Sequence, residues 1–324
     1  MRAGAILACA LIGALALSLA AAPARAQDAS QSTAQEDAII ITGKQPGPKM
    51  WVVTDEDSEV WILGITNYLP KSVRWDSARV ASVLDRANLV VTQTEVKAGA
   101  FTAIDALLTD RDVFFLPKKQ RLAQVLEPAR YARFLAARMK FGLDANPVER
   151  LRPAFAGLML IGGAVKQAGL DAGKNPEDQV KKLARRRGVK IRPLQIIKGK
   201  KALKAAGEIS EAAQLACLDA SLVVAERANS LIRPFSIAWA KGDIATLRAN
   251  PPPPELRVCE ALLRDSVDLL DDARTAGKAA YLREVADGLA QPGTRLVLIN
   301  MQDALDEDGL IANLRAKGYV VEGP

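Results

Sequence analysis

Short apolar runs near both ends of the chain constrain its fold more than any other feature. "VWIL" (60–63) and "NLVVT" (88–92) lie near one end, and "TRLVLIN" (294–300) and "YVVE" (319–322) lie near the other. Short runs of this length, rich in β-branched residues, are typical of buried β-strands. Strands at both ends with a large helical middle section predict an α/β fold with a mixed β-sheet.

The remaining elements follow from the change of apolar spacing along the chain. Met50–Val53 and Val60–Leu63 flank the acidic turn "TDEDSE" and are expected to form a hairpin. Val189–Ile196 alternates and is expected to be one strand. Helices are expected over residues 77–86, 118–142 with a break near Pro128, 146–169, 175–187, 208–232, 256–273, 281–289 and 308–318.

The first residues carry the pattern of a secretory signal peptide. Arg2 precedes the apolar run "AILACALIGALALSLAAA", and "ARA" has the shape of a cleavage site. We expect residues 1–26 to be removed after Ala26, and the alternative is a membrane anchor. Residues 27–47 are expected to be a flexible tail and residues 48–324 a single domain, in a periplasmic or secreted protein without a transmembrane segment.

The charge of the chain bounds its partners. The net charge is +7, and it falls to near +5 without Arg2 and Arg25. The excess is concentrated in "KKLARRRGVK" (181–190) and "KGKKALK" (198–204). In an exported protein such basic stretches suit anionic glycans, lipid headgroups or peptidoglycan rather than nucleic acid. The alternative is a solvated helix face next to a basic loop.

The chain contains no histidine, which excludes several kinds of catalytic site. Ser-His-Asp and Cys-His triads cannot form, and neither can a zinc site ligated by imidazoles. After signal removal Cys217 and Cys259 remain, and they are too few for a thiolate cage. An oxidising compartment permits a disulfide between them, and two buried free thiols are the alternative.

Several short motifs follow one another in a fixed order over residues 48–323. They are Trp51 near the hairpin, Gly64-x-x-Asn67, Leu69-Pro70, Trp75, a strand ending in Gln93, Gly169-Leu-Asp171, a strand ending in Gln195, Trp239 with Gly242-Asp243, and "LVLINMQDALDEDGLIANLRAKGYVV". In order, spacing and strand context, the chain resembles the TraB/GumN family, to which the TIKI metal-dependent proteases are related. The resemblance implies a TraB/GumN-like fold over most of the chain.

The chain departs from the pattern of that family at the glycine of the second Gly-x-x-His motif, which is Asn300 here, and at four positions of histidine or glutamate. The histidine of the first Gly-x-x-His motif is Asn67 here, and the second motif histidine falls at Asp303, or at Gln302 if the turn slips by one residue. The two strand-terminal glutamates of the family correspond to Gln93 and Gln195. In the related proteases two histidines and a glutamate are thought to hold a divalent metal. Amides retain the volume and hydrogen bonding of these groups but lose their charge and basicity.

The resemblance therefore implies a pseudoenzyme without a cofactor and without catalytic residues. We expect it to bind a glycan or peptide of the cell envelope in a residual cleft formed by Asn67, Gln93, Gln195 and Asp303. The alternative is a metal-dependent hydrolase or peptidase with a rewired oxygen-ligand site. In that case Asp303 and Glu95 would hold a divalent metal such as Mn²⁺ or Ca²⁺.

Overall fold

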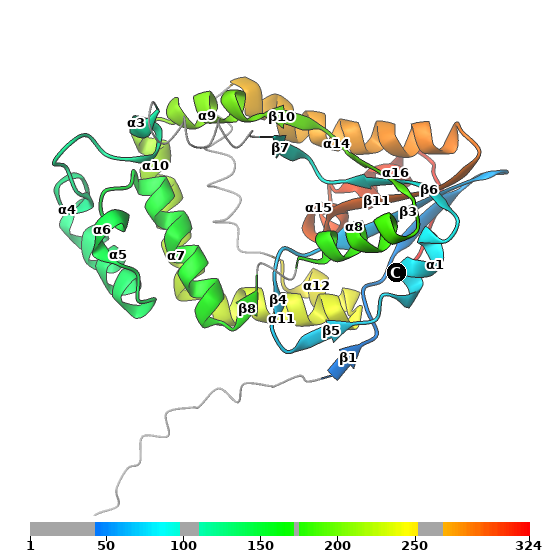
Figure 1. Cartoon of the computed structure of the whole chain (residues 1–324), viewed down its shortest axis with the longest axis horizontal. Coiled ribbons are helices and arrows are strands. Elements are labelled where there is room, and N and C mark those ends of the chain that lie inside the picture. Colours follow the sequence, from blue (N-terminus) through cyan, green and yellow to red (C-terminus); the bar gives the residue numbers. More distant parts are fainter. Residues whose placement is uncertain (1–42, 98–109, 172–174, 252–267) are drawn as a thin grey trace, which may run out of the picture. The chain divides into compact units, whose positions relative to one another are not determined.

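The computed structural model describes residues 43–97, 110–171, 175–251 and 268–324 (Figure 1). Contacts divide the chain into two units, Met1–Ile40 and Ile41–Pro324, and every described residue belongs to the second unit. Among the described residues, no helix has the length and apolarity needed to cross a membrane. The expected signal peptide lies outside the described residues, as does most of the expected tail, and both stay predictions.

A six-stranded mixed sheet is the centre of the fold, in the order β12-β2-β3-β11-β6-β9. Its strands are β2 (Trp51–Thr54), β3 (Ser58–Ile65), β6 (Ala87–Thr92), β9 (Lys190–Pro193), β11 (Gly293–Asn300) and β12 (Val321–Glu322). The predicted hairpin is the antiparallel pair β2–β3. Strands β3, β11, β6 and β9 are mutually parallel, and β12 joins β2 antiparallel. The predicted α/β class with a mixed sheet is confirmed.

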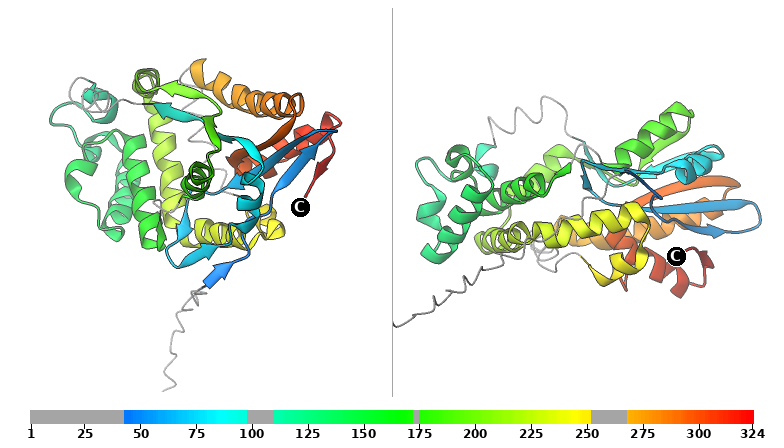
Figure 2. Two further views of the ribbon diagram at one scale, coloured as in Figure 1. Left: turned by 45° about the vertical axis from the view of Figure 1, so that its right-hand side comes forward. Right: turned by 90° about the horizontal axis from the view of Figure 1, so that it is seen from below.

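Helices cover both faces of this sheet, which explains why the central strands are apolar throughout. Helices α1 (Ala78–Leu84) and α8 (Pro176–Arg186) pack together against β6. The opposite face carries α14 (Asp268–Leu289), with α15 (Met301–Leu305) and α16 (Leu310–Ala316) beside it (Figure 2). Because β3, β11, β6 and β9 are parallel, their carboxyl ends meet at one edge of the sheet.

The other elements described complete the chain. They are β1 (Gly43–Gln45), β4 (Leu69–Pro70), β5 (Val73–Trp75), β7 (Glu95–Lys97), β8 (Leu170–Asp171), β10 (Ile196–Lys198), α3 (Arg111–Phe114), α4 (Leu122–Val125), α5 (Pro128–Lys140), α6 (Ala145–Val148), α7 (Pro153–Gln167), α9 (Gly199–Gly207), α10 (Glu211–Glu226), α11 (Ala228–Lys241) and α12 (Ile244–Ala249). Three two-stranded sheets accompany the large one, formed by β1 with β5, β7 with β10 and β4 with β8.

A second hydrophobic cluster holds the helices α4, α5, α7 and α10 together. Its fully buried members include Leu122, Phe134, Leu160, Leu218 and Leu222. Cys217 lies on α10, is fully buried and is disulfide-bonded. The other cysteines of the chain, Cys9 and Cys259, lie outside the described residues.

Several expected elements differ from the structure. The helix expected over residues 146–169 is the two helices α6 and α7, and the helix expected over residues 281–289 is the end of the longer α14. Most of the helix expected over residues 256–273 lies outside the described residues. The strand expected over Val189–Ile196 ends at Pro193, and the chain then pairs as β10 with β7. The single helix expected over residues 208–232 is two helices, because α10 ends at Arg227 and α11 begins there. The end of the expected tail, Gly43–Gln45, forms β1 and pairs with β5. Strands β10 and β1 pair with strands from distant parts of the chain, which local sequence patterns do not reveal. The apolar pattern continues across the break between α10 and α11, so the sequence does not show this break either.

The tryptophan and glycine motifs hold the turn after β3 in place. The Nε1 of Trp239 donates to the carbonyl oxygen of Gly64 at 2.7 Å, and both groups are buried. The Trp75 and Trp239 rings meet edge to face at 5.5 Å between centroids. Gly242 ends α11 with φ 69°, and a Cβ there would lie 2.7 Å from the carbonyl oxygen of Gly47. These motif residues are therefore explained by folding alone.

Candidate functional site

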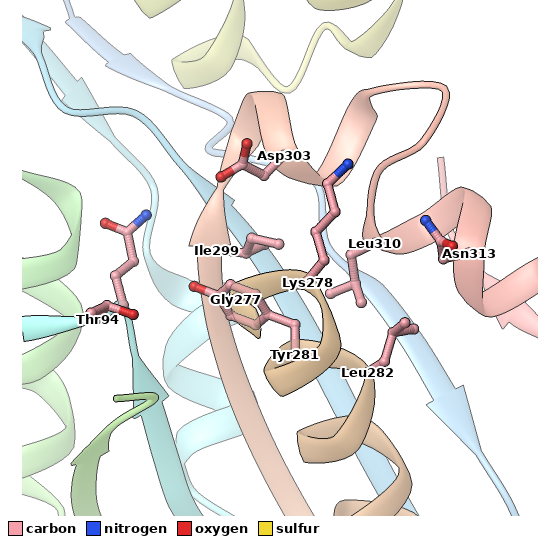
Figure 3. A pocket seen from close by; sticks show the side chains of 10 residues that line it. Thr94, Gly277, Lys278, Tyr281, Leu282, Ile299, Asp303, Leu310 and Asn313 are labelled. Atoms are coloured by element: carbon pink, nitrogen blue, oxygen red, sulfur yellow. The ribbon is translucent and has the colours of Figure 1, made fainter. Parts of the chain in front are cut away.

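A pocket lies at the edge of the sheet where the parallel strands end. Its volume is about 330 Å³. Its lining comes from the residues after β6, from α14, from the end of β11, and from α15 and α16, and consists of Gln93, Thr94, Gly277, Lys278, Tyr281, Leu282, Ile299, Asp303, Leu310 and Asn313 (Figure 3). Crevices at the carboxyl ends of parallel strands are the usual ligand sites of open α/β sheets.

Gln93 is the first residue after β6 and connects three elements. In the orientation that satisfies both ends of its amide, the side-chain oxygen accepts from the backbone N–H of Asn300 at 2.9 Å. The side-chain nitrogen then donates to Oε2 of Glu177 at 3.2 Å. Gln93 thus joins β6 to the end of β11 and to α8. An ionised glutamate at this position would instead face the carboxylate of Glu177.

Glu177 is a buried carboxylate behind the pocket wall, with 7% of its surface exposed. It lies in the first turn of α8, where Asn175 caps the helix by accepting from the backbone N–H of Glu177 at 2.9 Å. Nζ of Lys181, one turn along, lies 2.6 Å from Oε1 of Glu177. The helix N-terminus, Lys181 and Gln93 together stabilise a negative charge that would otherwise be costly to bury.

Tyr281 places a neutral phenol in the pocket. Its hydroxyl donates to the carbonyl oxygen of Leu298 at 3.2 Å. Burial raises the pKa of Tyr281 far above its ordinary value, and the negative charges of Asp303 and Glu177 raise it further. The phenol is therefore a hydrogen-bonding group that stays protonated near neutral pH, and it lies within the electrostatic reach of both carboxylates.

The pocket has a polar side and an apolar side. Figure 3 shows Thr94 across the pocket from Leu282, Leu310 and Asn313, with Tyr281 and Ile299 between them. Asp303 and Lys278 lie at one end of the pocket. Lys278 forms an ion pair with Asp308, and Asn313 Nδ2 donates to the carbonyl oxygen of Asp308 at 2.8 Å. The lining thus combines amide, hydroxyl and charged groups with an aliphatic wall.

The structure brings together only part of the predicted ligand cleft. Gln93 and Asp303 line the pocket. Asn67 is exposed on the connection from β3 to β4, because Leu69 pairs with Asp171 and draws the chain away from the sheet edge. Gln195 is half-buried between β9 and β10 and does not line the pocket.

Of the expected alternative metal pair, Asp303 with Glu95, only Asp303 lines the pocket. Glu95 is exposed on β7 and does not line the pocket. In the acidic loop, Gln302 Nε2 donates to Asp306 and Lys278 pairs with Asp308, so these acids have partners within the protein. Over the described ranges, no three His, Cys, Asp or Glu side chains are grouped so that they could hold a metal ion. The donor set at the pocket does not fit the metal of the related proteases.

Three titratable residues of the site do not appear in the motif comparison: Glu177, Lys278 and Tyr281. Asn175-Pro176 predicts the start of a helix, and an acid in its first turn is common, so the sequence gives no sign that Glu177 is buried. Lys278 and Tyr281 lie in the middle of a long helix. They line the pocket only because α14 packs beside the edge of the sheet where the pocket lies, and this packing cannot be read from the sequence.

Comparison with known proteins gives one match. A protein-family model described as the TraB/PrgY/gumN family matches residues 49–323, which is most of the chain. No curated protein and no solved structure matches the chain.

Proposed function

The chain belongs to the TraB/PrgY/gumN family, and from this premise we propose that it is an exported pseudoenzyme that binds a glycan or peptide of the cell envelope. The binding site is the pocket at the carboxyl edge of the sheet. The observation that carries this proposal is Gln93, whose amide forms hydrogen bonds to Glu177 and Asn300 at a position where the family has a glutamate. The amide fills the space of a metal ligand and supplies neither charge nor basicity.

The composition of the pocket supports a glycan or peptide as the ligand. Gln93, Thr94 and Asn313 offer amide and hydroxyl groups, and Tyr281 offers a phenol beside them. Leu282 and Leu310 offer an apolar wall across the pocket from Thr94, on the side where Asn313 also lies (Figure 3). Sugars and peptides combine hydrogen-bonding edges with apolar faces, which matches this division. The pocket volume of about 330 Å³ is at the small end of ligand sites, so one or two sugar or amino-acid units would be enclosed.

A binding screen with matched variants tests the proposal. Disaccharide-peptide fragments of peptidoglycan, neutral oligosaccharides and short peptides are titrated against the tag-free protein by ligand-observed NMR. We expect at least one class to bind and Gln93→Ala to weaken this binding by about ten-fold or more, since the pocket loses an amide that also bonds to Glu177 and Asn300. Asn67→Ala is the matched control, because this amide is exposed and lies outside the pocket lining. An equal loss in both variants, or no binding by any class, contradicts the proposal.

A second candidate function is a hydrolase with a rewired oxygen-ligand site. Asp303 and Glu177 both raise the pKa of Tyr281, so two carboxylates act on one phenol at the pocket. The hydrolase would need oxygen ligands for a hard divalent cation, and Asp303 is a carboxylate that lines the pocket. This candidate requires a stoichiometric divalent cation, which the binding proposal does not require.

A further inference from the structure

Several hydrogen-bond donors of the pocket lining are already used within the protein. The hydroxyl of Tyr281 donates to the carbonyl oxygen of Leu298 at 3.2 Å. Nδ2 of Asn313 donates to the carbonyl oxygens of Asp308 and Gly309 at 2.8 and 2.9 Å. A primary amide has two N–H groups, so these contacts use both donors of Asn313.

The amide of Gln93 and the ammonium group of Lys278 are also directed to groups of the protein. The side-chain nitrogen of Gln93 donates to Glu177 at 3.2 Å, and its oxygen accepts from the backbone N–H of Asn300 at 2.9 Å. Lys278 forms an ion pair with Asp308. The amide and lysine donors of the lining are thus engaged by partners from the chain itself.

The groups that the lining offers to a ligand are therefore mainly acceptors. Figure 3 shows the carboxylate of Asp303 and the hydroxyl of Tyr281 on the side of the pocket that faces Thr94, whereas the amino group of Lys278 points away from that side. A carboxylate has lone pairs for about four hydrogen bonds, so Asp303 can accept from a ligand in addition to its contacts within the protein. The phenol oxygen of Tyr281 can accept while its proton is donated elsewhere.

Negative charge is concentrated at this end of the pocket, although the whole chain has a net charge of +7. Residues 296–314, which include the end of β11, α15 and most of α16, contain four acids and no Lys or Arg. The negative charges of Asp303 and Glu177 reach the phenol of Tyr281 and add to the effect of burial in raising its pKa. A cationic ligand would be attracted to this side of the pocket, and an anionic ligand would be repelled.

We propose that the pocket recognises a primary ammonium group, which donates to the carboxylate of Asp303 on the side where Tyr281 and Thr94 also offer acceptors. An ammonium group has three N–H donors and no acceptor, so it matches a lining whose own donors are engaged. Its hydrogen bond to a carboxylate is of the strong, charge-assisted kind. This inference rests on the proposed binding function and narrows its ligand to a peptide or glycan that carries a free amine.

Two pairs of probes test this inference, and the members of each pair differ in acetylation of the amine. One pair is alanyl-alanine amide and its N-acetyl derivative, and the other is the disaccharide of glucosamine and its N-acetylated form. Affinities for the tag-free full chain are measured by ligand-observed NMR with a chelator present, at pH 6.5, where such amines are mainly protonated. We expect an amine probe to bind about ten-fold or more tightly than its acetylated partner. The pair that shows this preference identifies the source of the amine.

A pair of matched variants assigns the preference to Asp303. Asp303→Asn keeps the shape of the side chain and removes its charge, so affinity for the amine probe should fall about ten-fold while affinity for the acetylated probe stays the same. Glu307→Gln removes an exposed carboxylate of the same loop that lies outside the pocket lining, and we expect it to bind both probes as the unchanged chain does. Thermal melts establish that each variant is folded.

The possible failures of this inference and of the proposed function have different results. Equal affinity for amine and acetylated probes, with binding that depends on Gln93, overturns the ammonium inference and leaves the binding function in place. Equal losses in Asp303→Asn and Glu307→Gln also overturn the inference. Tighter binding of the acidic probe N-acetyl-alanyl-alanine, lost in Lys278→Gln, overturns it in favour of an anionic ligand. Absence of binding by every probe contradicts both the inference and the proposed function.

Discussion

Gln93 is the residue on which the interpretation of the site depends. Its amide donates to the buried carboxylate of Glu177 and accepts from the backbone N–H of Asn300. A glutamate in its place would set two carboxylates against each other, an arrangement that needs a cation or a shared proton. The amide removes that need, because it satisfies Glu177 by a hydrogen bond. At position 93 this chain therefore has a hydrogen-bonding amide and no charge.

The substitution Gln93→Glu tests this account, because it replaces the side-chain nitrogen with an oxygen and leaves the shape of the side chain almost unchanged. The new carboxyl group would face Glu177, so its pKa is expected to rise above the ordinary value of about 4.3. When the pKa of a carboxyl group is higher in the folded protein than in the unfolded chain, the group favours the folded state below its unfolded-state pKa. This contribution to stability is lost as the pH rises through the folded-state pKa. We expect the variant to lose about 1–3 kcal/mol of unfolding free energy at pH 7 and less at pH 5, measured by urea denaturation.

The matched control for this titration is Asn67→Asp, which adds the same charge at an exposed position outside the pocket. Its unfolding free energy should change by less than about 0.5 kcal/mol at both pH values. Equal stability of Gln93→Glu at pH 5 and pH 7 would show that Glu177 does not face position 93.

At the scale of elements, packing contacts fix the glycine of the turn after β3 and leave the side chain of Asn67 exposed. Gly64 lies against α15, where a Cβ would meet Met301 Sδ at 2.7 Å, and its carbonyl oxygen accepts from Trp239. Leu69 then pairs with Asp171, and Asn67 is left exposed between these contacts. The fold therefore requires the glycine and the tryptophan, whereas the exposed side chain of residue 67 is under no comparable packing constraint.

The packing of α7 against α10 gives a prediction for a pair of glycines. A Cβ at Gly157 would lie 2.7 Å from Cβ of Ser221 on α10, whereas a Cβ at Gly162 on the same helix would meet nothing within 4 Å. We expect Gly157→Ala to destabilise the protein by about 1–3 kcal/mol through overpacking. Gly162→Ala should stabilise it by about 0.5–1 kcal/mol, because alanine favours a helix.

Urea denaturation of both variants under the same conditions measures the difference. The two substitutions are chemically identical and lie on one helix. Opposite changes in their unfolding free energies would therefore be due to the contact of Gly157 with α10. A gain of stability in both variants would mean that α7 and α10 are not in close contact at Gly157.

The sequence predicts elements where local patterns decide, and it is less successful where tertiary contacts decide. The apolar runs predict β3, β6 and β11, and Pro128 marks the break before α5. No local sequence pattern predicts that α10 and α11 are separate helices. The apolar pattern continues through Arg227, while α10 packs in the helical cluster and Trp239 of α11 packs under the sheet.

At the scale of the whole molecule, the candidate site follows from the parallel sheet. Gln93 and Asp303 lie just after β6 and β11, which are neighbours in the sheet, so strand-end positions in the sequence identify them as one pocket. Gln195 also follows a strand, but the chain there turns to pair with β7. Glu177 and Tyr281 come from helices on opposite faces of the sheet. The approach of these two side chains to the pocket depends on how both helices pack on the sheet, so no local pattern in the sequence predicts it.

The claim that the pocket binds without metal chemistry is tested most directly by a calorimetric titration of MnCl₂ into the tag-free protein at pH 7.5. The chain has no imidazole, and Gln93 contributes an uncharged amide to the lining of the pocket. We therefore predict no saturable binding with a Kd below about 1 mM. Binding of one equivalent with a Kd of about 10 µM or less, abolished by Asp303→Asn, would contradict the account and favour the rewired hydrolase.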